Sequence, residues 1–214
     1  MKFSERINRA ILYATQQHEG QYRKDLELPN EERVPYITHP RAVAAIVAGY
    51  TDDEDVIIAA LFHDILEDVY EDIEKYPHAH DEMIEKFGDR VYEIVKGVSE
   101  KKDSKMSEQQ QIASWMERKK EYIEHLKRDS KESLLVACAD KIHNLKSLCS
   151  LYESSLDKTV AMKSFHAPEA PMSKELNILW YYKEVLKVLK MKLKNQIVEE
   201  MAKEVQELEK IFNA

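Results

Sequence analysis

The chain has few of the residues that interrupt regular structure. It contains only 4 glycines and 6 prolines among 214 residues, while charged residues make up 34% of it. Glycine and proline weaken or end helices, so their scarcity favours a helix-rich globular protein over a turn-rich β protein. Length alone does not decide between one large domain and two small ones.

Long apolar segments and cysteines are also scarce. No apolar run approaches the roughly 20 residues that span a bilayer, and no signal-peptide core follows the N-terminus. The two cysteines, Cys138 and Cys149, lie on one predicted helix about 16 Å apart, too far for a disulfide. We therefore expect a cytoplasmic protein with buried free thiols and no membrane partner.

The net charge of −8 argues against a protein that binds nucleic acid by neutralising phosphates. It does not exclude a small polyanionic substrate, because a metal ion and a few local cations can attract one. A nucleotide is therefore a compatible partner.

The most informative segment is His63-Asp64-Ile65-Leu66-Glu67-Asp68. It directly follows residues 56–62, which read VIIAALF and are apolar on every side. A helix with that sequence has no solvent face and must be buried. Buried charges are normally paired, hydrogen-bonded or placed on a metal, so this acidic and imidazole-bearing segment calls for a cation.

Two further ligands of the right kind are present elsewhere in the chain. His39 lies in Tyr36-Ile37-Thr38-His39-Pro40, and Asp140 lies in Ala139-Asp140-Lys141-Ile142-His143-Asn144. Together with His63 and Asp64 they give two imidazoles and two carboxylates. This donor set suits six-coordinate Mn²⁺, or Fe²⁺ or another divalent ion, better than a thiolate-rich structural zinc site. About two coordination positions would be left for water or a phosphate oxygen, as hydrolysis requires.

Glu67 and Asp68 are the predicted catalytic residues. If the buried helix continues through them, Glu67 shares a face with His63, and Asp68 shares one with Asp64. Acidic residues at a helix C-terminus oppose the helix dipole, so helix stability does not explain them. Glu67 is the candidate to orient or deprotonate a water molecule, and Asp68 to transfer a proton or to hold Glu67.

Four motifs in order closely resemble the hydrolase domain of the RelA/SpoT family of HD-domain phosphohydrolases. They are HEGQYRK at residues 18–24, PYITHP at 35–40, HDILED at 63–68 and ADKIHN at 139–144. The resemblance covers roughly residues 5–165. It implies an active hydrolase that removes pyrophosphate from the 3′ position of ppGpp and pppGpp. No synthetase-like segment follows Leu151, so the chain resembles a stand-alone small alarmone hydrolase.

The resemblance also implies the substrate contacts. Arg23 would stack on the base and Lys24 would lie near phosphate, while Asn144 would hydrogen-bond the sugar or the 5′ side. Lys141 flanks the metal motif as a further cation, and His143 is expected to act as a substrate group or behind the metal ligands.

The segments at residues 25–34 and 69–82 are longer than is usual in the family, which leaves the base preference open. Hydrolysis of adenine alarmones such as ppApp is one alternative. An HD-type 5′-nucleotidase is another, although the Arg-Lys and Glu-Asp motifs count against it. A non-catalytic alarmone-binding regulator is a third, and the intact ligand set disfavours it.

The helical pattern predicts an all-α fold, an HD-domain helical bundle with a long C-terminal extension. Residues 1–170 would form the metal-dependent phosphohydrolase domain, and residues 171–214 a helical extension packed on it. The pattern after residue 173 has no breaker over about forty residues. It predicts one long or kinked helix that packs on the core or, in a homo-oligomer, on a second subunit. Predicted starts of helices include Ser4, Asp52 or Asp53, Ser107, Glu132 and Ser173.

Overall fold

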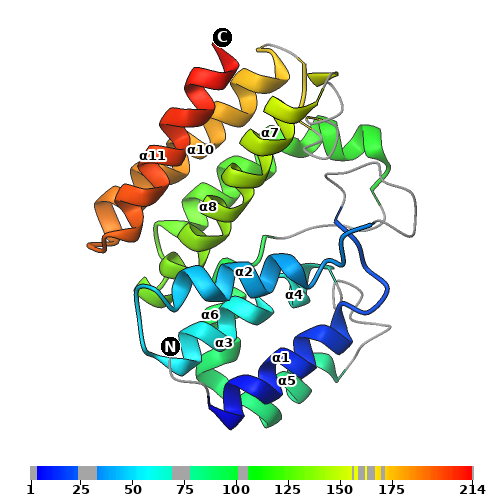
Figure 1. Cartoon of the computed structure of the whole chain (residues 1–214), viewed down its shortest axis with the longest axis vertical. Coiled ribbons are helices and arrows are strands. Elements are labelled where there is room, and N and C mark those ends of the chain that lie inside the picture. Colours follow the sequence, from blue (N-terminus) through cyan, green and yellow to red (C-terminus); the bar gives the residue numbers. More distant parts are fainter. Residues whose placement is uncertain are drawn as a thin grey trace.

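The computed structural model describes residues 4–23, 33–68, 78–100, 106–155, 157–158, 162, 167–169 and 172–213, apart from the side chains of Asp68 and Ala79. Helices dominate these residues (Figure 1), which confirms the predicted all-α class. The helices are α1 (Glu5–Gln17), α2 (Thr38–Val47), α3 (Glu54–Phe62), α4 (Ile65–Asp68), α5 (Ala79–Phe87), α6 (Asp89–Val98), α7 (Glu108–Leu126), α8 (Lys131–Ser154), α10 (Lys174–Lys192) and α11 (Ile197–Phe212). In this part of the chain, extended pairing is limited to an isolated bridge between Tyr22 and Pro35.

Several helices begin after a polar residue whose side chain caps them. The side chains of Ser4, Asp53, Ser107 and Ser173 each accept a hydrogen bond from a backbone N–H of the first turn. Such caps satisfy backbone donors that have no partner within the helix. These four predicted starts are confirmed, while α8 begins slightly earlier than predicted, after its cap Ser130.

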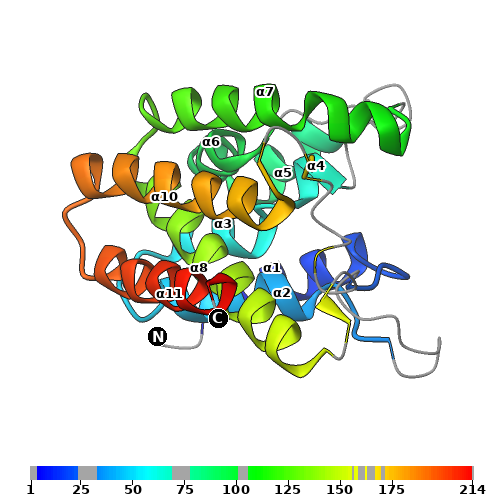
Figure 2. The ribbon, with the colours of Figure 1, turned by 90° about the horizontal axis from the view of Figure 1, so that it is seen from above.

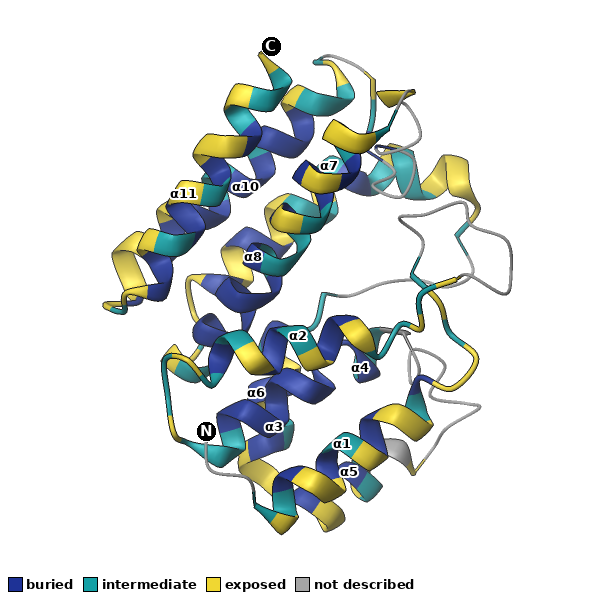
Figure 3. Ribbon diagram, in the orientation of Figure 1, coloured by how far each residue is buried: buried dark blue, intermediate teal, exposed yellow. Residues whose placement is uncertain are grey.

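α3 lies at the centre of one helical layer. All seven residues from 56 to 62 are buried, as their uninterrupted apolar sequence predicts. α1, α2, α6 and α8 surround this helix, and Figure 3 shows the buried residues concentrated on the inward faces. The segment that follows α3 therefore emerges inside the protein.

α8 joins this layer to a second one. One side of α8 packs on α2, α3 and α6, and the other side packs on α10 and α11. Figure 1 and Figure 2 both show α10 and α11 running beside α8. Because α8 is covered on both sides, polar residues in its middle are enclosed.

The prediction of one long or kinked C-terminal helix is wrong, because this part of the chain forms two helices. The chain turns between α10 and α11, at residues 193–196, and the two helices pack against each other as well as on α8. The side-chain Oδ1 of Asn195 accepts a hydrogen bond from Ile197 N at 3.0 Å, which satisfies a donor at the start of α11. Asparagine makes such local bonds in competition with helix continuation. The domain division at residue 170 and a second-subunit contact stay predictions.

Two expectations from composition can be compared with the structure. Cys138 and Cys149 are free and buried, which confirms the predicted thiols. Among the helices described here, none is long and apolar enough to cross a membrane.

Candidate metal centre and active site

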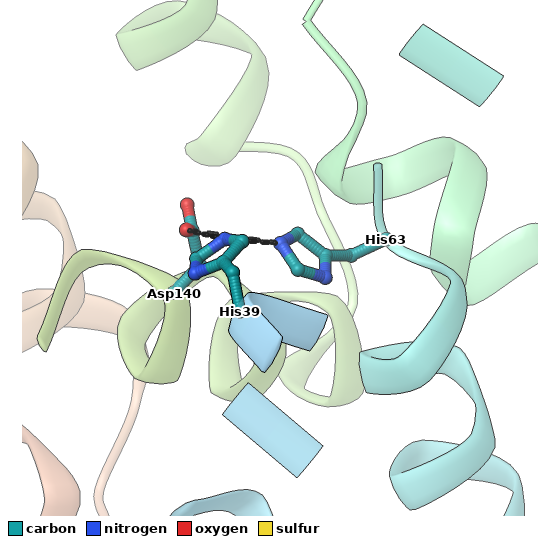
Figure 4. Close-up of side chains that lie close together, drawn as sticks. All are labelled: His39, His63 and Asp140. Atoms are coloured by element: carbon teal, nitrogen blue, oxygen red, sulfur yellow. Dashed lines mark hydrogen bonds and ion pairs between the residues drawn. The ribbon is translucent and has the colours of Figure 1, made fainter. Parts of the chain in front are cut away.

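Three buried side chains from three helices converge at the predicted metal centre (Figure 4). His39 lies in the first turn of α2, His63 directly follows α3, and Asp140 lies in the middle of α8. His39 Nε2 is 3.2 Å from both His63 Nε2 and Asp140 Oδ1, and His63 Nε2 is 3.7 Å from Asp140 Oδ1. One ligand atom from each residue lies within 4.8 Å of the others. Ligand atoms at about these separations can share one cation.

Asp64 lies beside this trio. Its Oδ2 is 3.1 Å from His63 Nε2 and 3.4 Å from His39 Nε2, although Asp64 is not part of the mutually close group. The Tyr36 hydroxyl donates a 2.6 Å hydrogen bond to the same oxygen. The structure thus brings the four predicted ligands together, and Asp64 is the one that is hydrogen-bonded to Tyr36.

Hydrogen bonds orient both imidazoles. His63 Nδ1 donates to the Ala60 carbonyl oxygen at 2.8 Å, so Nε2 faces the cluster and carries the lone pair when the imidazole is neutral. His39 Nδ1 lies 2.8 Å from His143 Nδ1. His143 therefore contacts the ring nitrogen of His39 that does not face the cluster. Residues that orient metal-binding histidines commonly occupy this position.

The electrostatics of the cluster favour a cation at its centre. Burial opposes the charged form of His63, yet Asp64 and Asp140 raise the pKa of its imidazole well above the ordinary value. Burial likewise opposes ionisation of Asp64, but His63 and His39 hold its pKa well below the ordinary value. For Asp140, Lys141 and the two histidines outweigh burial in the same direction. Both carboxylates are thus ionised and a positive charge between them is stabilised, which a divalent ion can supply.

The prediction that HDILED continues the buried helix is wrong. α3 ends at Phe62, His63 and Asp64 form a turn, and α4 begins at Ile65. In an uninterrupted helix the Ala60 carbonyl would accept from the backbone N–H four residues later, but the His63 side chain donates to it instead. Glu67 is therefore placed by the turn and by α4, and not by sharing a face of α3 with His63.

Glu67 nevertheless lines the same cavity as the metal trio. This cavity has a volume of about 190 Å³. Glu67 Oε1 accepts a 2.7 Å hydrogen bond from the backbone N–H of Glu100, which follows α6. The side chain of Asp68 lies outside the described residues, so the predicted role of Asp68 stays a prediction.

The predicted substrate residues divide into three groups. Arg23, Lys141 and Asn144 line the cavity, whereas His143 contacts His39 and Lys24 lies outside the described residues. Lys141 Nζ and Asn144 Nδ2 each donate to Asp140, both at 2.6 Å. These two residues therefore hold a predicted metal ligand in place, and their contact with substrate stays a prediction.

Some of the residues that line the cavity were not predicted from the sequence. The unpredicted lining residues include Tyr36, Glu100, Lys119 and Tyr122. Tyr36 lies within the PYITHP motif, and its proximity to His39 is the signal that could have identified it. No comparable signal exists for Lys119, because it lies in a charged stretch of α7 and reaches the site only through the packing of that helix.

The sequence resembles known hydrolases over most of its length. The HD domain family matches residues 10–166. The chain is 36% identical over 140 residues to a guanosine-3′,5′-bis(diphosphate) 3′-pyrophosphohydrolase of Haemophilus influenzae, covering 65% of this chain and 18% of that protein. It is 35% identical over 147 residues to the corresponding enzyme MESH1 of Xenopus tropicalis, covering 66% of this chain and 69% of that protein. The chain thus spans less than a fifth of the bacterial relative and about two thirds of the frog relative.

Solved structures share the fold. One, described as a metazoan ortholog of SpoT that hydrolyses ppGpp, is 24% identical with a TM-score of 0.64, covering 100% of this chain and 97% of that one. A protein of Listeria monocytogenes EGD-e is also 24% identical, with a TM-score of 0.59, covering 82% of this chain and 99% of that one.

Proposed function

The chain belongs to the HD domain family, and we propose that it removes pyrophosphate from the 3′ position of the guanosine alarmones ppGpp and pppGpp. The observation that carries the proposal is the convergence of His39, His63 and Asp140 on a cavity that Glu67 also lines. Support for the substrate comes from the two hydrolases named above, which act on guanosine-3′,5′-bis(diphosphate).

His39, His63, Asp64 and Asp140 would hold one divalent cation, and we propose Mn²⁺, with Fe²⁺ or another divalent ion as the alternative. The nitrogen and oxygen donors on converging side chains fit such an ion. When bound, it would lower the pKa of water and offset negative charge on the phosphate under attack.

Glu67 is the proposed general base. It would take a proton from the water that attacks the phosphorus bonded to the 3′ oxygen. A bond forms between the water oxygen and phosphorus, and the bond between phosphorus and the 3′ oxygen breaks. The 3′ oxygen then takes up a proton, for which Asp68 is the proposed donor. The products from ppGpp are GDP and pyrophosphate.

The other polar groups of the cavity would position the nucleotide. Arg23 lies 6.0 Å from the centre of the Tyr36 ring, and its planar guanidinium can stack on a base. Lys141 and Asn144 lie on the Asp140 side of the cavity, where the sugar and phosphates would bind. Lys24 is proposed to contact phosphate, and His143 to act through His39.

The decisive experiment incubates Mn²⁺-loaded protein with ppGpp, ppApp and dGMP and separates the products by anion-exchange chromatography. We expect GDP and pyrophosphate from ppGpp. Turnover of ppApp alone would indicate an adenine alarmone hydrolase. Release of orthophosphate from dGMP alone would favour a 5′-nucleotidase. Binding of ppGpp without turnover would favour a regulator.

The role of Glu67 is tested with Glu67→Gln. This variant should lose turnover but keep the metal bound, and full activity in it would remove Glu67 from the mechanism.

A cytoplasmic location is part of the same proposal. Its support is that both cysteines, 138 and 149, are buried free thiols, as is usual in a reducing compartment.

A further inference from the structure

Glu100 links the proposed general base to α7, a helix that supplies none of the proposed metal ligands. Its backbone N–H donates to Glu67 Oε1 at 2.7 Å. Its carboxylate accepts from Arg118 at 2.8 Å and from Lys119 at 2.6 Å, both on α7. One residue thus contacts Glu67 through its backbone and α7 through its side chain.

The end of α6 makes the Glu100 N–H available. α6 stops at Val98, and both the backbone N–H and the hydroxyl of Ser99 donate to the Val95 carbonyl oxygen, at 3.1 and 2.9 Å. Glu100 is therefore the first residue beyond the helix and its cap, and its backbone N–H points to Glu67 and not along α6. Hydrogen bonds from N–H groups to carboxylates are stronger than those between neutral groups.

The Glu100 carboxylate is held firmly. Only 11% of its side chain is exposed, so an unpaired charge there would be costly. Burial opposes its ionisation, yet Lys119 and Arg118 keep the pKa of the Glu100 carboxyl below its usual value. Glu100 therefore stays charged and bonded to both cations.

Arg118 is itself braced within α7. Its Nε donates to Ser114 Oγ at 3.3 Å, and its second amino group donates to the Gln111 carbonyl oxygen at 3.2 Å. Arg118 is not among the residues that line the cavity, whereas Glu100 and Lys119 are. An effect of Arg118 on catalysis would therefore act through Glu100.

We propose that Glu100 is a positioning residue for the hydrolytic reaction. Arg118 and Lys119 fix its carboxylate, and this fixes the peptide whose N–H orients the Glu67 carboxylate toward the attacking water. The inference rests on the proposed function, since it assigns Glu67 the role of base.

The kinetic test uses Glu100→Gln and Arg118→Met. Both keep the peptide N–H; Glu100→Gln removes the charge with which both cations pair, and Arg118→Met removes one of the two ion pairs. Because misplacing a catalytic group by about 1 Å can cost about 100-fold, we expect kcat for ppGpp to fall about tenfold while KM changes less than about twofold. Arg118→Lys should recover part of the rate. Lys120→Met, which removes an exposed cation of α7, serves as the matched control and should keep the full rate. Unchanged kcat in both test variants, or a rise in KM with kcat unchanged, would overturn the proposal.

A second measurement does not depend on turnover. In protein labelled with ¹⁵N-glutamate, the Glu100 amide signal is identified by its disappearance in Glu100→Gln. We expect its proton resonance to move upfield in Glu67→Gln and in Arg118→Met, as its hydrogen bond weakens. A signal that stays in place in both variants overturns the positioning role even if ppGpp is hydrolysed. If the signal moves but wild-type protein leaves ppGpp intact, the hydrogen bond is supported and the proposed substrate is the part that fails.

Discussion

The phenol of Tyr36 donates a 2.6 Å hydrogen bond to Asp64 Oδ2, the same oxygen that lies 3.1 Å from His63 Nε2. Tyr36, which precedes α2, thus holds the Asp64 carboxylate beside the two histidines. A hydrogen bond of this kind fixes the orientation of a ligand before the ion arrives.

Tyr36→Phe should therefore weaken metal binding without unfolding the protein. The change removes one hydroxyl that supports a ligand, and loss of such a supporting group costs about 10- to 100-fold in metal affinity. The measurement is a competition titration of Mn²⁺ against a chelator of known affinity. Tyr22→Phe, which changes a residue that is 39% exposed, is the control. Equal affinity in wild type and Tyr36→Phe would show that Asp64 needs no such support.

Removal of the metal should lower thermal stability. An ion present at about 100 times its Kd stabilises the native state by about 2.7 kcal/mol, which corresponds to a change in Tm of about 5–10 °C for a chain of this size. We expect EDTA to lower the Tm of the Mn²⁺-loaded protein by that amount in scanning calorimetry. In His39→Ala the chelator should have no effect, because one of the three converging ligands is missing. A similar decrease in that variant would place the stabilising ion elsewhere.

Gly97 on α6 permits a close approach to α8. A Cβ atom at position 97 would lie 2.5 Å from Ser133 Oγ and 3.0 Å from Ser133 Cβ. Gly97→Ala should therefore lower the free energy of unfolding by about 1–3 kcal/mol, the usual cost of overpacking. Urea denaturation gives the value. A double-mutant cycle with Ser133→Ala should show that the second change relieves part of the clash, and strictly additive effects would contradict this.

The hydrogen bond from Tyr50 to Glu200 predicts a dependence of stability on alkaline pH. The phenol donates to the carboxylate at 2.6 Å. This bond, together with burial and the negative charge of Glu200, raises the pKa of Tyr50 to about 12. Because the folded-state pKa lies above the unfolded value of 10.0, the stabilisation is complete below pH 10 and is lost as the pH rises toward about 12.

The check is urea denaturation of wild type and Tyr50→Phe at several pH values. Below pH 10 the wild type should be the more stable protein, and the difference should shrink between pH 10 and 12. Since Tyr50 is only partly buried, solvent screening keeps the effect small. A constant difference over that range would mean that the hydrogen bond does not form in solution.

The sequence was sufficient to predict that His39, His63, Asp64 and Asp140 lie together, because burial of the segment after residue 62 is signalled locally and the four motifs occur in the order of the family. The apolar run at 56–62 predicted burial, and burial made a cation the simplest partner for His63 and Asp64. Serine and aspartate caps predicted where several helices start, since a cap bonds to the turn next to it.

Features that depend on tertiary packing were not predictable in the same way. The end of α3 at Phe62 depends on the His63 imidazole competing for the Ala60 carbonyl oxygen, which the pattern of residues does not show. The turn at Asn195 similarly depends on the packing of both α10 and α11 against α8. The ion pairs of Glu100 join residues 18 and 19 positions apart, and they form only because α6 and α7 lie against each other.

α8 connects α10 and α11 to the metal centre, and no residue of these two helices is among those that line the cavity. Cys138, two residues before Asp140, lies with its Sγ 3.9 Å from Met201 Sδ and 3.8 Å from the Ile197 carbonyl oxygen, both on α11. α2 and α3, which position His39 and His63, pack on the other side of α8, so the spacing between the histidines and Asp140 is set by the packing of α8 on these helices. A larger side chain at position 138 would therefore crowd Met201 and Ile197 only two residues from Asp140, so the α8–α11 interface constrains the segment that carries this proposed ligand.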